Sequence, residues 1–289
     1  MPDSVRGLRK NALFLLRRNP RLLFGFLRSG LGYKLLSSFL PRVPLQGKIG
    51  KIAFEFDFSL DDNIKAMYFD FYEPETLYVF RRFLRPGDVF IDAGASIGYL
   101  SALGASLVGK TGQVHSFEPV PQYFQRLKGL KRLNPEYNIS LNPCALAEKE
   151  AQTRISISRS GNIGWNTMVP GFMDPRDIRE QMQIRTIRLD AYIKQKQLSR
   201  IALIKIDVEG FEFQVLKGLG NYLQDAACRP VIICEICPDS IYALLGQRRK
   251  QLIEYMQKYG YCAYSPFAPN QRIDISRLKE TAIVVFRPD

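Results

Sequence analysis

The chain has 289 residues, of which 46% are hydrophobic, 24% charged and 12% aromatic, and its net charge is +13. This size and composition suit one globular domain with a buried core and exclude a wholly disordered, collagenous or coiled-coil protein. Five cysteines are too few for a secreted disulfide framework, so we expect free thiols and a cytoplasmic protein. A membrane-spanning helix is not expected, because no run of about 18 apolar residues occurs.

The positive charge is concentrated at the start of the chain. Residues 1–45 contain nine basic side chains and one acid, interleaved with leucine and phenylalanine in a basic amphipathic pattern. This pattern predicts a helical segment that lies on an anionic membrane surface, as a peripheral contact at the cytoplasmic face. The alternative, which the sequence leaves open, is a pair of helices docked on the body with their basic side solvated.

A single domain is expected over residues 46–289, beginning with a strand pair over residues 46–73. Residues 48–58 alternate apolar and polar side chains, which is typical of a strand with one buried face. We expect residues 66–71 to be its partner strand. A helix then begins at Pro74, because proline suits the first turn of a helix.

Residues 74–289 alternate between strand and helix patterns and should form the cofactor-binding and catalytic core. We expect strands at residues 88–92, 113–118, 139–143, 201–207 and 231–236, and helices from Ile97, over 121–133 and from Glu212. This alternation predicts an α/β, Rossmann-like, mostly parallel seven-stranded sheet with helices on both faces. The last two strands, near 260–265 and 281–286, lack a crossover helix between them and should form an antiparallel pair.

The turn FIDAGASIGYL follows the first strand of the core, where a ligand site is expected. Gly94 and Gly98 allow the backbone to approach a ligand closely, and the helix that follows offers unpaired N–H groups. Asp92 replaces the first glycine of a dinucleotide fingerprint. Its carboxylate would repel a pyrophosphate but attract an ammonium or sulfonium group. The turn therefore favours S-adenosylmethionine over NAD, with Asp92, Gly94, Ala95 and Gly98 as cofactor-binding residues.

A second acid, Glu118, closes the next strand, where a carboxylate can accept hydrogen bonds from both hydroxyls of a ribose. After the third strand, Ala145 and Leu146 offer a small apolar wall suited to an adenine face. Acids at strand ends also cap helices, so a purely structural interpretation of Asp92 and Glu118 stays open.

At this point the sequence resembles the FkbM-type methyltransferases, within the class I S-adenosylmethionine-dependent methyltransferases. The resemblance spans roughly residues 75–287 and rests on FIDAGASIGYLS, SFEP, SGNIGWNT, RLDAYI and IKIDVEGFEFQVLKG. Ser96 stands where the family commonly has asparagine, and residues 1–45 lie outside the resemblance. The resemblance implies O-methylation of a hydroxyl on a sugar, glycan, glycolipid or natural product.

The string IKIDVEGFE places Asp207 at the tip of the fourth strand, with Glu209 just beyond it. A carboxylate there can orient an acceptor hydroxyl or take its proton. Alternatively, Asp207 and Glu235, at the end of the fifth strand, gather Mg²⁺ together with Glu209 and lower the pKa of the acceptor hydroxyl. Glu212 is interpreted equally well as a functional acid or as a first-turn helix acid.

Residues 160–183 form a long insertion that contains the only tryptophan, Trp165. Trp165 either stacks on a sugar face within a lid over the acceptor or pins a surface loop. Cys234 and Cys237 form a C-x-x-C pattern, but their odd offset points them to opposite faces of a strand, and no histidine completes a zinc set. We therefore expect both to be buried structural thiols.

Two other functions compete with O-methylation. An N-methyltransferase acting on nucleic acid or protein usually presents an Asn/Asp-Pro-Pro-aromatic loop after the fourth strand, whereas residues 207–210 read DVEG. These acids would repel phosphates, so nucleic acid is not expected as a partner. A non-catalytic, membrane-associated binding module is the other alternative, and the intact set of Asp92, Gly94, Gly98 and Glu118 argues against it.

Overall fold

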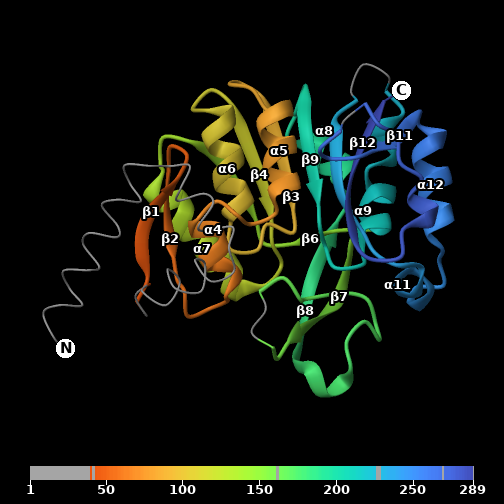
Figure 1. Cartoon of the computed structure of the whole chain (residues 1–289), viewed down its shortest axis with the longest axis horizontal. Helices are drawn as coiled ribbons and strands as arrows, with labels where there is room; N and C mark the ends of the chain where they lie inside the picture. Colours follow the sequence, from red (N-terminus) through yellow and green to blue (C-terminus); the bar gives the residue numbers. More distant parts are fainter. Residues whose placement is uncertain (1–39, 41–42, 161–162, 226–228, 269, 289) are drawn as a thin grey trace, which may run out of the picture. The chain divides into compact units, whose positions relative to one another are not determined.

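The computed structural model describes residues 40, 43–160, 163–225, 229–268 and 270–288 (Figure 1). The chain divides into two units, Met1–Pro44 and Leu45–Asp289, and everything below concerns the second unit. Almost all of the predicted basic helical segment lies outside the described residues, so that segment and its membrane contact stay predictions. Among the described residues, no helix is long and apolar enough to cross a membrane.

A seven-stranded sheet forms the centre of the second unit (Figure 1). Its order is β11-β12-β10-β9-β3-β4-β5, and the five strands from β10 to β5 are parallel. Strand β12 runs antiparallel to both β10 and β11, which confirms the predicted C-terminal pair and the mostly parallel, Rossmann-like sheet. The strands are β3 (Val89–Ala93), β4 (Gln113–Phe117), β5 (Asn138–Asn142), β9 (Ile201–Ile206), β10 (Val231–Ile236), β11 (Tyr261–Tyr264) and β12 (Ala282–Pro288).

Helices cover both faces of this sheet, as the alternation predicted. Along β3, Phe90 packs into one hydrophobic core while Val89 and Ile91 pack into another, because successive side chains of a strand point to opposite faces. The first core holds α5 (Pro74–Phe83), α6 (Tyr99–Val108) and α7 (Pro121–Leu133). The second holds α8 (Leu189–Gln195), α9 (Glu212–Gly218) and α12 (Arg249–Lys258), while α10 (Gly220–Leu223) and α11 (Asp239–Leu244) are short.

The predicted N-terminal strand pair needs a correction. Strands β1 (Leu45–Ile49) and β2 (Ile52–Phe56) form a hairpin with each other, so the first strand finds its partner locally. Residues 66–71, the predicted partner, instead contain the end of α4 (Asn63–Tyr68). Ile64 and Met67 are both buried, and their three-residue spacing suits one side of a helix rather than one face of a strand.

A second, three-stranded sheet has the order β6-β8-β7. It consists of β6 (Ala145–Leu146), β7 (Ala151–Ser158) and β8 (Ile178–Ile187), with β7 and β8 antiparallel. The predicted insertion over residues 160–183 is therefore shorter than expected, because β8 already begins at Ile178. Two short 3₁₀ turns, η1 (Pro175–Asp177) and η2 (Ile275–Arg277), complete the fold.

Candidate active site

A cavity of about 220 Å³ lies where β3, β4, β9 and β10 end, as expected for a sheet of this kind. Most of the predicted site residues line it together, although they are scattered over more than 140 positions of the chain. These lining residues are Gly94, Ala95, Glu118, Ala145, Leu146, Trp165, Asp207, Glu209 and Glu235. Asp92 and Gly98 do not line it. Their individual roles in binding or catalysis stay predictions.

The turn after β3 is shaped by its two glycines. Gly94 has a φ of +82°, and a Cβ added there would lie 2.0 Å from the carbonyl oxygen of Asp207. Gly98 has a φ of +91°, and a Cβ there would lie 2.7 Å from a methyl group of Leu127. Gly94 therefore brings the turn against the loop after β9, whereas Gly98 lets α6 pack against α7 rather than contacting a ligand.

Glu118 lies at the cavity surface and is held by the backbone. Its Oε2 accepts a hydrogen bond from the N–H of Ser96, and its Oε1 accepts one from the N–H of Val120, both at 2.8 Å. Burial raises the pKa of Glu118 to about 7, although these two N–H groups act in the opposite direction. Each carboxylate oxygen can accept a further hydrogen bond, so the residue is oriented to bind hydroxyl groups.

Asp92 lies behind the cavity wall and is fully buried. Its Oδ2 accepts a hydrogen bond of 2.6 Å from the hydroxyl of Ser101, and its Oδ1 lies 4.0 Å from Nζ of Lys205. The structure therefore does not bring Asp92 into the direct cofactor position that the sequence predicted. Lys205, which lines the cavity, links Asp92 to it.

Lys205 is the main site residue that sequence reasoning missed. Its Nζ lies 3.1 Å from Oδ2 of Asp207 and donates a hydrogen bond of 3.2 Å to the carbonyl oxygen of Gly94. Burial alone would lower the pKa of Lys205, but Asp207, Asp92 and Glu73 raise it above its ordinary value, so the ammonium stays charged. The available signal was a lysine inside the apolar strand IALIKI.

Three acids crowd together in the part of the cavity lined by the loop after β9 and the end of β10. One carboxylate oxygen from each of Asp207, Glu209 and Glu235 lies within 4.8 Å of the other two. Burial, together with the charge of Asp207, raises the pKa of Glu209 to about 9 and that of Glu235 to about 10. Glu73, before α5, lines the same cavity, and burial and Asp207 raise its pKa as well. At neutral pH, Glu209 and Glu235 therefore hold protons.

The loop between β9 and α9 is fixed by Glu212. Its Oε1 accepts hydrogen bonds from the N–H groups of Val208 (3.2 Å) and Gly210 (2.9 Å). The hydroxyl of Thr167 adds a hydrogen bond of 2.6 Å to the carbonyl oxygen of Glu209. Glu212 is fully buried and does not line the cavity. Oε1 of Glu212 therefore has the structural role of fixing this loop, whereas Oε2 makes no hydrogen bond within the described part of the chain.

Trp165 lines the cavity but keeps 48% of its surface exposed. The loop around it is held by backbone hydrogen bonds between Thr167 and Ser156 rather than by burial of the tryptophan ring. This geometry favours the lid interpretation over a loop that its own tryptophan pins. The only histidine, His115, is a buried strand residue that contacts the hydroxyl of Tyr192 at 2.9 Å, outside the cavity.

A mostly parallel seven-stranded sheet with a glycine turn after β3 and an acid after β4 defines an α/β protein of the Rossmann-like class. Residues 92–262, more than half of the chain, match the family model described as the methyltransferase FkbM domain. The chain therefore belongs to the FkbM methyltransferase family.

Two curated relatives are similar to this chain. The chain is 30% identical over 163 residues to the 31-O-demethyl-FK506 methyltransferase FkbM of Streptomyces tacrolimicus, and 29% identical over 140 residues to the hexuronic acid methyltransferase AglP of Haloferax volcanii. Each alignment covers 47% of this chain, and it spans 61% and 52% of the two relatives. The crystal structure of precorrin-6y C5,15-methyltransferase from Geobacter metallireducens is similar with a TM-score of 0.41 at 11% identity, covering 75% of this chain and 89% of that chain.

Proposed function

We propose that this protein transfers the methyl group of S-adenosylmethionine to a hydroxyl oxygen of a sugar, glycan, glycolipid or natural product. The observation that carries the proposal is the Lys205–Asp207 ion pair, which lies in the same cavity as the glycine turn and Glu118. The names of the two curated relatives support O-methylation and a sugar-type acceptor, but a hexuronic acid carries a carboxylate, so they do not bear on the charge of this acceptor.

The lining of the cavity fits S-adenosylmethionine. Glu118 offers two oriented oxygens to a ribose, and the small side chains of Ala145 and Leu146 offer an apolar surface to an adenine. The hydroxyl of Ser96 is buried in the cavity wall without a hydrogen-bond partner among the described residues, which leaves it available to a polar ligand. The acids near Lys205 match the positive charges of the cofactor.

The bound cofactor supplies an electrophilic methyl group. Asp207, held by Lys205, orients the acceptor hydroxyl and takes its proton as the oxygen becomes a nucleophile. Glu209 and Glu235, protonated at neutral pH, donate hydrogen bonds to neighbouring acceptor oxygens. The half-exposed ring of Trp165 covers the acceptor, as aromatic rings do on sugar faces.

The charges of the cavity favour a neutral acceptor. Of the described residues that line it, Lys205 is the only basic one, and its ammonium is already engaged by Asp207, Asp92 and the carbonyl oxygen of Gly94. An acceptor with a carboxylate or phosphate would therefore find no free basic side chain to neutralise it among these lining residues. The same argument disfavours nucleic acid as the substrate of an N-methyltransferase.

A second use of the acids is the predicted binding of Mg²⁺ by Asp207 and Glu235, together with Glu209. The spacing of their oxygens and the preference of this hard cation for oxygen ligands support it. Under this alternative, turnover falls on adding a chelator and returns with Mg²⁺, whereas proton removal by Asp207 alone needs no divalent ion.

The test is methyl transfer from labelled S-adenosylmethionine to pooled neutral, amino and acidic glycans. We expect label in the neutral pool, and we expect Asp207→Asn to lower turnover about 100-fold or more while S-adenosylhomocysteine still binds. The matched control is Glu254→Gln, which removes an exposed acid on α12 and should leave turnover unchanged. Equal losses of turnover and cofactor affinity in Asp207→Asn would assign Asp207 to the cofactor site instead.

A further inference from the structure

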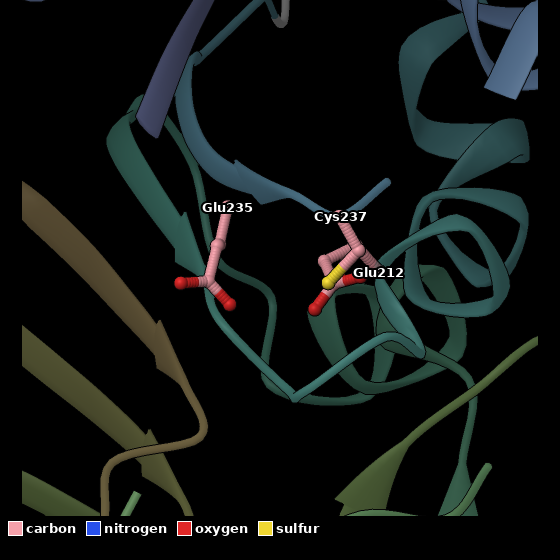
Figure 2. Close-up of side chains that lie close together, drawn as sticks. All are labelled: Glu212, Glu235 and Cys237. Atoms are coloured by element: carbon pink, nitrogen blue, oxygen red, sulfur yellow. The ribbon is translucent and has the colours of Figure 1, made fainter. Parts of the chain in front are cut away.

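Three side chains of metal-ligand type meet beside the cavity: Glu235 in β10, Cys237 just after it and Glu212 at the start of α9 (Figure 2). One carboxylate oxygen of each glutamate and the Sγ of Cys237 all lie within 4.8 Å of one another. Glu235 belongs to β10, which ends at Ile236, and Cys237 is the next residue along the chain. Strand β9 pairs with β10, and the loop that follows β9 leads to Glu212.

Glu212 supplies the observation that points to a ligand. It is fully buried, and Oε1 accepts both of its backbone hydrogen bonds. Oε2 has no hydrogen-bond partner within the described part of the chain. Native proteins rarely leave a buried carboxylate oxygen unpaired, and a bound ion is one of the arrangements that satisfy it.

No basic side chain neutralises this cluster among the described residues. The ion pairs of Lys205 go to Asp92 and Asp207, and neither Glu212 nor Glu235 forms one. A buried carboxylate, a half-buried carboxylate and a buried thiol without a counter-ion are costly unless protons or a cation fill the space between them.

We propose that Glu212, Glu235 and Cys237 form a binding site for a borderline transition-metal cation of the Zn²⁺ type. The thiolate separates this site from one for Mg²⁺ or Ca²⁺, which select oxygen ligands, whereas Zn²⁺ binds both carboxylate oxygen and thiolate sulfur. Bonds of about 2.0–2.3 Å place the ligand atoms of a tetrahedral zinc site roughly 3.5 Å apart, so rotation of the side chains closes the site.

Three protein ligands leave one coordination position for a water or a substrate oxygen. Glu235 also lines the cavity, so the ion has an entry path and lies next to the acceptor end. Binding releases the thiol proton of Cys237, because the thiolate is the ligand. The site does not depend on methyl transfer, and the metal binds whether or not the acceptor is a sugar.

Cobalt(II) is the spectroscopic probe, added to the metal-free full-length protein. We expect one equivalent to bind with a thiolate-to-cobalt charge-transfer band, and Zn²⁺ to displace it while millimolar Mg²⁺ does not. Cys237→Ser should lose the band and weaken Zn²⁺ binding at least 10-fold. Cys234→Ser is the matched control, because Cys234 is equally buried yet lies outside the cluster.

Glu212→Gln should also weaken Zn²⁺ at least 10-fold. Absence of the band in the wild-type protein, or an unchanged band in Cys237→Ser, would overturn the proposal. Thermal unfolding of each variant checks that it folds. If Cys237→Ser does not fold, the rate of alkylation of Cys237 in the wild-type protein is measured with and without Zn²⁺ instead. Slower alkylation with Zn²⁺ supports the site, and an unchanged rate overturns it. S-adenosylhomocysteine affinity, measured in parallel, separates failure of this site from failure of the proposed methyl transfer.

Discussion

The two ends of the cavity satisfy their charged groups in different ways. At the cofactor end, Glu118 is held by two backbone N–H groups and the turn is fixed by Gly94. At the acceptor end, Glu209 and Glu235 crowd around Asp207, and the pKa values of these two glutamates are raised to about 9 and 10. The cofactor end is therefore organised in advance by hydrogen bonds. At the acceptor end, the carboxylates repel one another unless protons, a cation or a substrate neutralise them.

Lys205 contacts groups in both parts of the cavity, so its removal should destabilise the protein more than any other substitution below. Lys205→Met leaves the fully buried Asp92 without its cation, and breaking a buried pair in this way costs about 3–5 kcal/mol of unfolding free energy. Chemical denaturation measures the loss. Lys217→Met removes a lysine that pairs with Glu148 and is more exposed than Lys205, so it should cost about 1 kcal/mol or less. Equal losses in the two variants would show that Lys205 is not the link.

Gly94→Ala tests the organisation of the cofactor end. The added methyl group meets the carbonyl of Asp207 at a positive φ, so we expect a loss of about 2–4 kcal/mol in unfolding free energy. The matched control is Gly129→Ala in α7, where the new Cβ meets nothing within 4 Å. It should stabilise the protein by about 0.5–1 kcal/mol. Thermal and chemical unfolding should show that Gly94→Ala destabilises the protein and that Gly129→Ala stabilises it. A change in unfolding free energy of the same sign in both variants would contradict this account of the turn.

Glu118→Ala tests cofactor recognition separately from the fold. Loss of a charged hydrogen-bond acceptor should weaken S-adenosylhomocysteine binding by about 1.5–3 kcal/mol. Isothermal titration calorimetry measures the change, with the exposed Glu136→Ala as a control that keeps full affinity. An unchanged affinity in Glu118→Ala would remove the ribose contact from the account.

The raised pKa of Glu235 at the acceptor end predicts how the stability of the protein depends on pH. A carboxyl group whose pKa is raised in the folded state stabilises the fold below its unfolded pKa, and this contribution is lost as pH rises through the folded pKa. For Glu235 the loss extends from about pH 4.5 to about pH 10. Between pH 5 and pH 9, the melting temperature of Glu235→Gln should therefore fall less than that of the wild-type protein. Parallel curves would show that Glu235 titrates normally.

Much of the cofactor end could be predicted from sequence, because its signals are local. Short spacings along the chain identify the strand before Asp92, the glycines of the turn and the acid that closes the next strand. Residues 66–71 were wrongly predicted as a strand, because the hairpin of β1 and β2 closes locally and the helical spacing of Ile64 and Met67 was overlooked.

The contacts that join the two parts of the cavity were less accessible from sequence. Lys205 contacts Asp92, and Gly94 approaches the loop after β9, although these positions lie more than 100 residues apart in the chain. The alternation of side chains along a single strand cannot predict such contacts. The parity argument for Cys234 and Cys237 treated them only as a pair. The predicted placement on opposite faces is wrong, because Cys237 lies beyond the end of β10 and both cysteines pack into the same core. Cys237 there approaches Glu235 and Glu212, which strand alternation cannot predict.

Calorimetric titration with S-adenosylhomocysteine, with NAD titrated in parallel, tests the central claim that this cavity is a cofactor site built for a methyl donor. The account predicts micromolar binding of S-adenosylhomocysteine, weakened in Glu118→Ala, and no binding of NAD. Binding of NAD, or no binding of S-adenosylhomocysteine by the folded protein, would contradict it.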